Sequence, residues 1–504
     1  DGRVDVIHPR GPTGLTLGGE GGFREPGLRE GFLPPGGPTY AVQPMDVDED
    51  GWLDLLVGQT PSCDGKTTSI WIQVAPDVLK QMDELVVGAG GEAWVDAFLP
   101  LPGTSAAERS GVFAVSLSCD QARPFPGFYE FQRDGVGGHP RLVPVDPLPV
   151  NPYWSVTPAG YGARVTQVSP MGASLEDLTG DGVGELLVTV DYAALFDRSS
   201  GTWVDRTLEG GLRDYPVDGD YFIPWAVVHP DLDMDGRADV VVTYGDDSTS
   251  FRTVRGMPHP TVAWRNDGRL RFTKLPELGL PRDGGWRGAV LADPDCDGDA
   301  DLALGGMGVE PRLLRNDIET GRVGLSLRFR GTTSNPLGLG AVVEVEVEGL
   351  PKRTMIVGAV GNPFGIVTPE VFAGLGEVGV ARTVRVRWPS GTEQVLHDVD
   401  GGRCLTVEEP PLLRVTPATR HAPADGRSRV EILISPRDAM GGVRLDAVVQ
   451  VRLEGAPAVV EGLLATPEGA VVSVIAPEAP GSTVVVVTLD GHEVGVRPRL
   501  WWDG

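Results

Sequence analysis

A nine-residue acidic pattern occurs four times in this chain, and each copy runs directly into a short apolar segment. We call these copies the four acidic loops; they span residues 46–54, 177–185, 231–239 and 293–301. Positions 1, 3, 5 and 9 carry carboxylates, except for a threonine at position 3 of the second copy, and position 6 is always glycine. Glycine permits a sharp turn at that point, so the odd-numbered side chains can converge on one centre.

Carboxylates packed this closely repel one another, so the pattern is costly unless a cation neutralises it. An EF-hand begins in the same way but needs a glutamate at position 12 and flanking helices, whereas here apolar strands follow. A metal-free Asp-Gly turn is the alternative for any single loop. Four copies favour calcium, about four ions in all, because flexible carboxylate-rich cages suit Ca²⁺ better than Mg²⁺. The predicted metal ligands are Asp46, Asp48, Asp50, Asp54, Asp177, Thr179, Asp181, Glu185, Asp231, Asp233, Asp235, Asp239, Asp293, Asp295, Asp297 and Asp301.

The spacing of the loops predicts the architecture of the first part of the chain. A partial copy at residues 1–7 and a worn copy near residues 103–120 complete a series of repeats about 50 to 65 residues long. Each repeat holds several strands and no helical period, which indicates the blades of a β-propeller. Residues 262–273 add a hairpin signal, since an Asn-Asp-Gly turn separates two apolar runs. We therefore expect an all-β chain that starts with a seven-bladed calcium-binding β-propeller at residues 1–317.

The acidic loops, with the Leu-Leu-Val-Gly type of strand after them, resemble FG-GAP/VCBS repeats. Such repeats form the propeller of integrin α-subunits and of many secreted bacterial proteins. Residues 325–343, 372–376 and 384–391 resemble the ASPIC/UnbV domain, which follows FG-GAP repeats in the cartilage acidic protein family and its bacterial relatives. This resemblance implies a second β-domain at residues 318–409. Residues 357–364 depart from it, because a Gly/Ser-rich segment is expected there.

The composition changes after the proline pair at positions 410 and 411. Residues 412–504 contain short alternating strands, which are typical of an Ig-like β-sandwich. Residues 424–438 also resemble the bacterial Ig-like modules of surface adhesins. The sequence thus predicts three domains in series.

The chain has four cysteines. Cys63 and Cys119 occupy equivalent positions in adjacent repeats, so a disulfide between them is plausible. Cys296 stands at position 4 of an acidic loop, where its side chain points away from an ion, and it could pair with Cys404. The alternative for both pairs is a buried or unpaired thiol. Calcium sites of this kind favour an oxidising, extracytoplasmic setting, and no cysteine or histidine spacing suggests zinc.

The formal net charge of −27 argues against nucleic acid or an anionic membrane as partner. No apolar run is long enough for a transmembrane segment, and no catalytic motif accompanies the seven scattered histidines. We expect a secreted or cell-surface calcium-binding protein, not an enzyme, that acts in adhesion, matrix building or recognition. Its partner is a glycan or protein ligand on the propeller loop face, or another copy of itself. The alternative is a carbohydrate-active enzyme of the polysaccharide lyase type, since some of these enzymes use calcium-bearing propellers.

Overall fold

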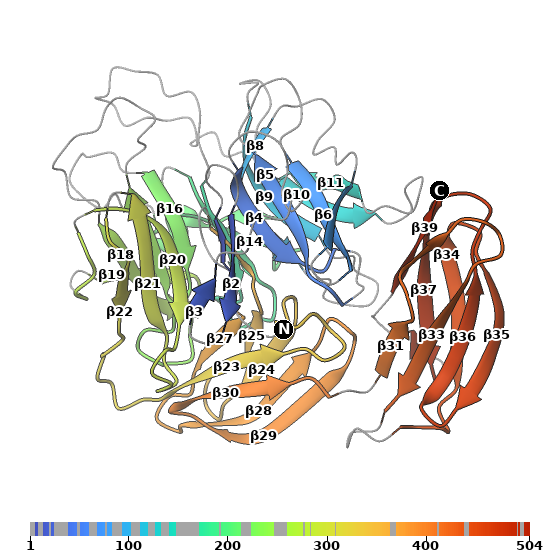
Figure 1. The fold of residues 1–504 in the computed structure, drawn as a ribbon. Helices are drawn as coiled ribbons and strands as arrows, with labels where there is room; N and C mark the ends of the chain where they lie inside the picture. Colours follow the sequence, from blue (N-terminus) through green and yellow to red (C-terminus); the bar gives the residue numbers. More distant parts are fainter. Residues whose placement is uncertain are drawn as a thin grey trace.

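The computed structural model is built almost entirely from β-strands (Figure 1). Within its described residues one short helix occurs, α1 (Thr207–Gly210). The chain is therefore nearly all-β. The structure describes residues 6–8, 14–19, 22–24, 39–47, 51–59, 68–75, 78–82, 93–101, 111–118, 127–132, 141–147, 171–190, 193–212, 223–245, 260–275, 278–282, 284–307, 309–362, 369–410, 413–437, 443–490, 492–493 and 498–504.

The N-terminal region, residues 1–317, contains six antiparallel sheets among its described residues. Apart from one strand that the middle domain adds to one sheet, the strands of each sheet pair in the order in which they follow in the chain, as in propeller blades. The number of blades and the closure of the ring stay predictions. The strands are β1 (Val6–His8), β2 (Gly14–Gly19), β3 (Gly22–Arg24), β4 (Thr39–Met45), β5 (Asp54–Gln59), β6 (Thr68–Ala75), β7 (Val78–Met82), β8 (Ala93–Leu101), β9 (Gly111–Ser118), β10 (Gly127–Gln132), β11 (Arg141–Pro147), β12 (Ala173–Glu176), β13 (Glu185–Thr189), β14 (Ala193–Asp197), β15 (Val204–Asp205), β16 (Ile223–Val228), β17 (Val240–Gly245), β18 (Thr261–Gly268), β19 (Arg271–Leu275), β20 (Gly285–Ala292), β21 (Asp301–Met307) and β22 (Arg312–Leu314).

The strands that follow two of the acidic loops are completely buried. All residues of β13 and of β17 are buried, so both faces of these strands pack against neighbours. A strand buried on both faces needs a continuous apolar run instead of an alternating one, which explains the Val-Val-Val segment at the start of β17. The predicted hairpin is confirmed as β18 and β19, which pair antiparallel around Gly268.

The middle domain, residues 318–409, consists mainly of two sheets with the strand orders β27-β23-β30 and β25-β24-β28-β29. Both sheets contribute to one core, which includes Leu327, Val343 and the fully buried Trp388. Figure 1 shows this domain, in yellow and orange, below the sheets of the N-terminal region. The strands are β23 (Gly324–Arg330), β24 (Val342–Glu346), β25 (Arg353–Ile356), β26 (Val360–Gly361), β27 (Glu370–Gly374), β28 (Val380–Arg387), β29 (Glu393–Asp400) and β30 (Arg403–Glu408).

A short segment of the middle domain enters the N-terminal region. Strand β26 pairs antiparallel with β12 and becomes the fifth strand of that sheet. The Asn362 amide donates to the carbonyl of Val227 at 3.1 Å and accepts from its N–H at 3.0 Å. The same amide lies 3.5 Å from the carbonyl oxygen of Ala289. Because Val227 and Ala289 belong to two further sheets, this segment joins the first strands of three successive sheets.

The C-terminal module, residues 412–504, has two sheets with the strand orders β31-β33-β36-β35 and β32-β39-β37-β34. One core lies between them and includes Ile432, Val472, Val485 and Trp502. Two packed sheets agree with the predicted sandwich, whereas the Ig-like assignment stays a prediction. The strands are β31 (Leu413–Pro417), β32 (His421–Pro423), β33 (Arg429–Pro436), β34 (Val449–Gly455), β35 (Val459–Thr466), β36 (Gly469–Ile475), β37 (Gly481–Leu489), β38 (His492–Glu493) and β39 (Arg499–Asp503).

The C-terminal module rests on the N-terminal region through its last strand. Trp501 belongs to the buried cluster of Met45 and Val47, whereas its neighbour Trp502 belongs to the core of the module itself. Successive side chains of a strand point to opposite faces, so β39 serves both cores. The boundaries of the three domains stay predictions.

Candidate metal centres

The first aspartate of each acidic loop folds the loop around its own carboxylate. In loop 231–239, the Asp231 carboxylate accepts hydrogen bonds from the N–H groups of Asp235 at 3.0 Å and Gly236 at 2.9 Å. The equivalent bonds in the other loops run from Gly51 to Asp46, from Gly180, Asp181 and Gly182 to Asp177, and from Asp297 and Gly298 to Asp293. These repeated contacts draw the first half of the loop into a compact turn.

Two positions of the turn require a left-handed backbone. The glycine at position 6 has a φ of 86° to 95° across the four loops, which L-residues rarely adopt. Position 4 is also left-handed in three loops, at Gly180, Met234 and Cys296. The sequence predicts the left-handed conformation at position 6, where glycine recurs. It does not predict the one at position 4, where the residue type varies between loops.

The carboxylate at position 9 links the loop to its sheet. Asp239 is buried and accepts from the N–H of Leu232 at 2.9 Å and from the N–H of Asn266, on the third strand of the sheet, at 2.8 Å. Asp54 makes the same pair of bonds, to Val47 at 2.9 Å and Gln73 at 2.8 Å. Position 9 therefore has a structural role as well as being a candidate ligand.

Burial makes the ionised form of several of these carboxylates unfavourable. Desolvation is the main cause that raises the pKa of Asp231 to about 7 and the pKa of Glu185 and Asp239 to about 8, and nearby carboxylates add to it. The pKa of Asp299, at position 7 of loop 293–301, rises to about 7 for the same two reasons. A bound cation would offset both effects, because it supplies the opposite charge.

The residues present fit a hard cation. Within the described part of the chain, two groups of three carboxylates each offer ligand atoms within 4.8 Å of one another. In one group, Oδ1 of Asp233 is buried and has no hydrogen-bond partner among the described residues. Such an orphaned carboxylate oxygen is suited to a metal ion, so the acidic clusters could bind one. The groups are Asp231, Asp233 and Asp239, and Asp293, Asp295 and Asp297.

The remaining predicted ligands are placed differently. Asp235 forms an ion pair with Arg237, and Oδ1 of Asp301 accepts from the N–H of Asn316 at 2.8 Å. In loop 177–185, Thr179 donates to Glu185 at 3.3 Å. Asp177 and Asp181 lie in the same loop, where described residues form no group of three. Asp48 and Asp50, like Cys63 and Cys119, lie outside the described residues.

Two asparagines connect neighbouring sheets at the loops. The fully buried Asn266 donates to the carbonyls of Leu178 at 2.9 Å and Ala238 at 3.0 Å, which belong to two successive acidic loops. Asn316 repeats this contact by donating to the carbonyl of Leu232 at 3.1 Å. The Arg-Asn-Asp signal in the sequence indicates a hairpin, but it does not reveal this link between sheets.

A disulfide joins an acidic loop to the middle domain. Cys296, at position 4 of loop 293–301, pairs with Cys404 of β30, and their Cα atoms are 4.8 Å apart. This is one of the two pairings considered from the sequence. The other pairing lies outside the described residues.

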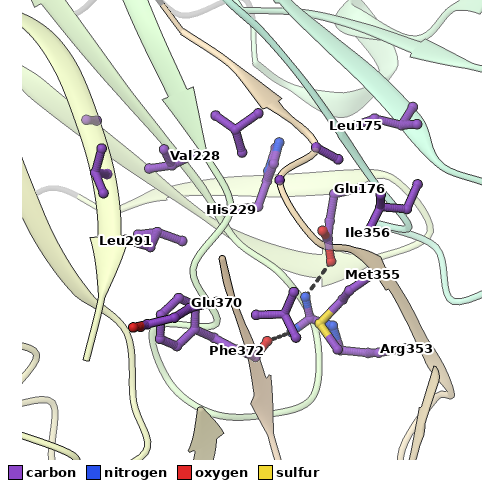
Figure 2. A pocket seen from close by; sticks show the side chains of 16 residues that line it. Leu175, Glu176, Val228, His229, Leu291, Arg353, Met355, Ile356, Glu370 and Phe372 are labelled. Carbon is purple, nitrogen blue, oxygen red and sulfur yellow. Dashed lines mark hydrogen bonds and ion pairs between the residues drawn. The ribbon is translucent and has the colours of Figure 1, made fainter. Parts of the chain in front are cut away.

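A cavity of about 70 Å³ lies between the N-terminal region and the middle domain (Figure 2). Its polar lining includes Glu176, which forms an ion pair with Arg353, and His229. Burial lowers the pKa of His229 to about 4, so the ring is neutral. Ligand pockets usually measure roughly 300–1,000 Å³, and this cavity is much smaller. It resembles a packing gap at the domain junction.

Two family models match parts of the chain. A model described as an FG-GAP-like repeat matches residues 231–304, and a model described as ASPIC and UnbV matches residues 331–412. The chain therefore contains an FG-GAP-like repeat, which includes two acidic loops, and an ASPIC/UnbV domain that covers most of the middle domain. Neither family is typically enzymatic. A propeller-like fold agrees with the first match and with the successive sheets.

A comparison with curated proteins gave no match. Among solved structures, the chain is similar to invasin, a bacterial integrin-binding protein, with 12% sequence identity and a TM-score of 0.17. The alignment covers 56% of this chain and 60% of that one. This similarity is too low to support an argument about fold or function. No helix in the described ranges is long and apolar enough to cross a membrane.

Proposed function

We propose that this protein is a secreted or cell-surface recognition or adhesion protein whose propeller is stabilised by calcium bound in the four acidic loops. The observation that carries the proposal is the arrangement in loop 231–239. There, three carboxylates offer oxygens within 4.8 Å of one another, two of the three residues are buried, and one buried oxygen has no hydrogen-bond partner among the described residues. Calcium accepts such oxygen-rich sets with flexible geometry.

In this proposal the metal has a structural role. Each acidic loop precedes a central strand of a sheet. In three of the loops the position-9 carboxylate, on Asp54, Glu185 or Asp239, accepts from the N–H of position 2 and so holds the strand to the loop. A ligand that binds only the folded state stabilises it by about 2.7 kcal/mol when present at a hundredfold excess over its Kd. Residues such as Asp231 and Asp239 would hold the ion through carboxylate oxygens, and the ion would supply the positive charge that offsets their repulsion.

The partner would be a glycan or protein that binds on an outer surface of the propeller, or another copy of the chain. Residues 357–362 already occupy the space beside the first strands of several sheets. A Cβ added to Gly361 would lie 2.6 Å from the carbonyl oxygen of Phe98, so the backbone fits tightly there. Residues 357–362 thus fill this space. An active site at the mouth of the propeller channel would need the space between these strands to be open, so the enzyme alternative is not favoured.

A glycan array probed with and without chelator, alongside a polysaccharide cleavage assay, tests the proposal. We expect calcium-dependent binding to a ligand surface and no cleavage. A measurable turnover that chelator abolishes while the melting curve stays unchanged would contradict it and support the enzyme alternative.

A further inference from the structure

All four acidic loops contact the middle domain. A Cβ added to Gly51 would lie 2.8 Å from the carbonyl oxygen of Thr333, and one added to Gly298 would lie 2.5 Å from that of Gly324. A Cβ added to Gly236 would lie 3.0 Å from Leu350. In loop 177–185 the contact is made at position 4, where Pro351 lies 3.0 Å from a Cβ added to Gly180. The middle domain therefore covers the face of the N-terminal region that carries the candidate metal centres.

Loop 231–239 is hydrogen-bonded directly to this domain. The N–H of Gly376 donates to the carbonyl of Met234 at 3.0 Å, in the centre of the loop. The N–H of Gly374 donates to Oδ2 of Asp231, a predicted ligand, at 3.1 Å. Both donors are backbone groups, so their positions depend on the docking of the whole domain.

Arg322, in the segment that enters the middle domain, holds a second predicted ligand. Its Nη1 donates to Oδ2 of Asp233 at 3.0 Å and to the carbonyl of the same residue at 3.1 Å. Oδ1 of Asp233 remains buried and without a hydrogen-bond partner among the described residues. One oxygen is thus fixed by the arginine, and the other is left for a cation.

We propose that the middle domain supplies the outer shell of the metal centre in loop 231–239, so that cation binding and docking of this domain stabilise each other. The inference rests on the proposed calcium site. Gly374 orients Asp231, Arg322 orients Asp233, and neither residue contributes a ligand atom. Groups that orient metal ligands typically change metal affinity about 10- to 100-fold when they are lost.

The positive charge of Arg322 opposes calcium binding, because one cation near the site repels a second. Its side chain is one-third exposed, so solvent and salt screen this repulsion. The Gly374 contact is electrically neutral and carries no such opposing effect. The buried Arg353 guanidinium of the middle domain, 3.7 Å from Oδ2 of Asp231, opposes calcium in the same way and is not screened by solvent. The proposal therefore requires that the orientation of the ligands outweighs both positive charges. By reciprocity, calcium then strengthens docking by the same factor with which docking strengthens calcium binding.

Gly374→Ala in the full chain tests the proposal without removing a ligand or a charge. The added Cβ would collide with Oδ2 of Asp231 and with the backbone of Met234. The matched control is Gly305→Ala on β21, where an added Cβ meets no atom within 4 Å. Calorimetric titration with CaCl₂ should show that one site is lost or weakened at least tenfold in Gly374→Ala only. Unchanged stoichiometry and affinity in Gly374→Ala would overturn the inference.

A second measurement uses the unaltered chain, so it does not depend on the folding of a variant. Calcium should slow the hydrogen exchange of the Gly374 and Gly376 amides about tenfold or more, and Asp233→Asn should remove much of this effect. Calcium binding without slower exchange at these amides would overturn the coupling but leave the proposed calcium site standing. Absence of any calcium binding to the unaltered chain would overturn the proposed site, and the coupling with it.

Discussion

Replacement of Asn266 by alanine should loosen two neighbouring sheets at once. The Asn266 side chain is fully buried and makes three hydrogen bonds: it donates to the carbonyls of Leu178 and Ala238 and accepts from the N–H of Gly268 at 2.9 Å. Each such bond contributes roughly 0.5–1.5 kcal/mol. Asn266→Ala should therefore lower the local free energy of opening by about 3 kcal/mol.

Hydrogen exchange of peptides that cover β13, β17 and β18 measures this free energy locally, which suits a chain of several domains. Since about 1.4 kcal/mol corresponds to a factor of ten, exchange in these strands should become more than about a hundredfold faster. Arg265→Ala is the matched control, because this neighbour on the same strand is exposed and should change stability by less than about 0.5 kcal/mol. An Asn266→Ala effect as small as the control would refute the proposed link between sheets.

Three further changes test the packing around the loops. Gly298→Ala should lower the melting temperature more than Gly201→Ala, because both have a positive φ but only the first would also collide with the middle domain. Trp501→Ala should lower the free energy of unfolding by about 3–5 kcal/mol and release the C-terminal module from the N-terminal region, which would increase the radius of gyration in X-ray scattering. Trp502→Ala should instead unfold the module itself. Cys404→Ser removes a link across 108 residues and should cost about 2–5 kcal/mol; an unchanged thermal midpoint would contradict this.

Local features of this chain were predictable from the sequence because neighbouring residues determine them. The acidic loop and the strand after it lie within about fifteen consecutive residues, so spacing and glycine position are enough to predict both. The hairpin around Gly268 has the same origin. The disulfide between Cys296 and Cys404 was one of two pairings that the sequence suggested, and spacing alone left the unpaired thiol open as an alternative.

The contacts between distant segments could not be predicted in this way. Asn362 bonds Val227 across 135 positions in the chain, and nothing near either residue indicates the other. Residues 357–364, which include Asn362, depart from the expected ASPIC/UnbV pattern, but this departure does not indicate which strands they contact. Arg322 and Gly374 reach loop 231–239 from 89 and 143 positions away, so the cover over the candidate metal centres emerges only in three dimensions.

The most direct test of the calcium sites is anomalous X-ray diffraction from crystals of the full chain grown with CaCl₂. The account predicts one ion in each of the four acidic loops. In loop 231–239, the ion should lie about 2.3–2.6 Å from carboxylate oxygens that include those of Asp231, Asp233 and Asp239. An anomalous map with no peak among these carboxylates, at a calcium concentration that saturates ordinary extracellular sites, would contradict the central claim.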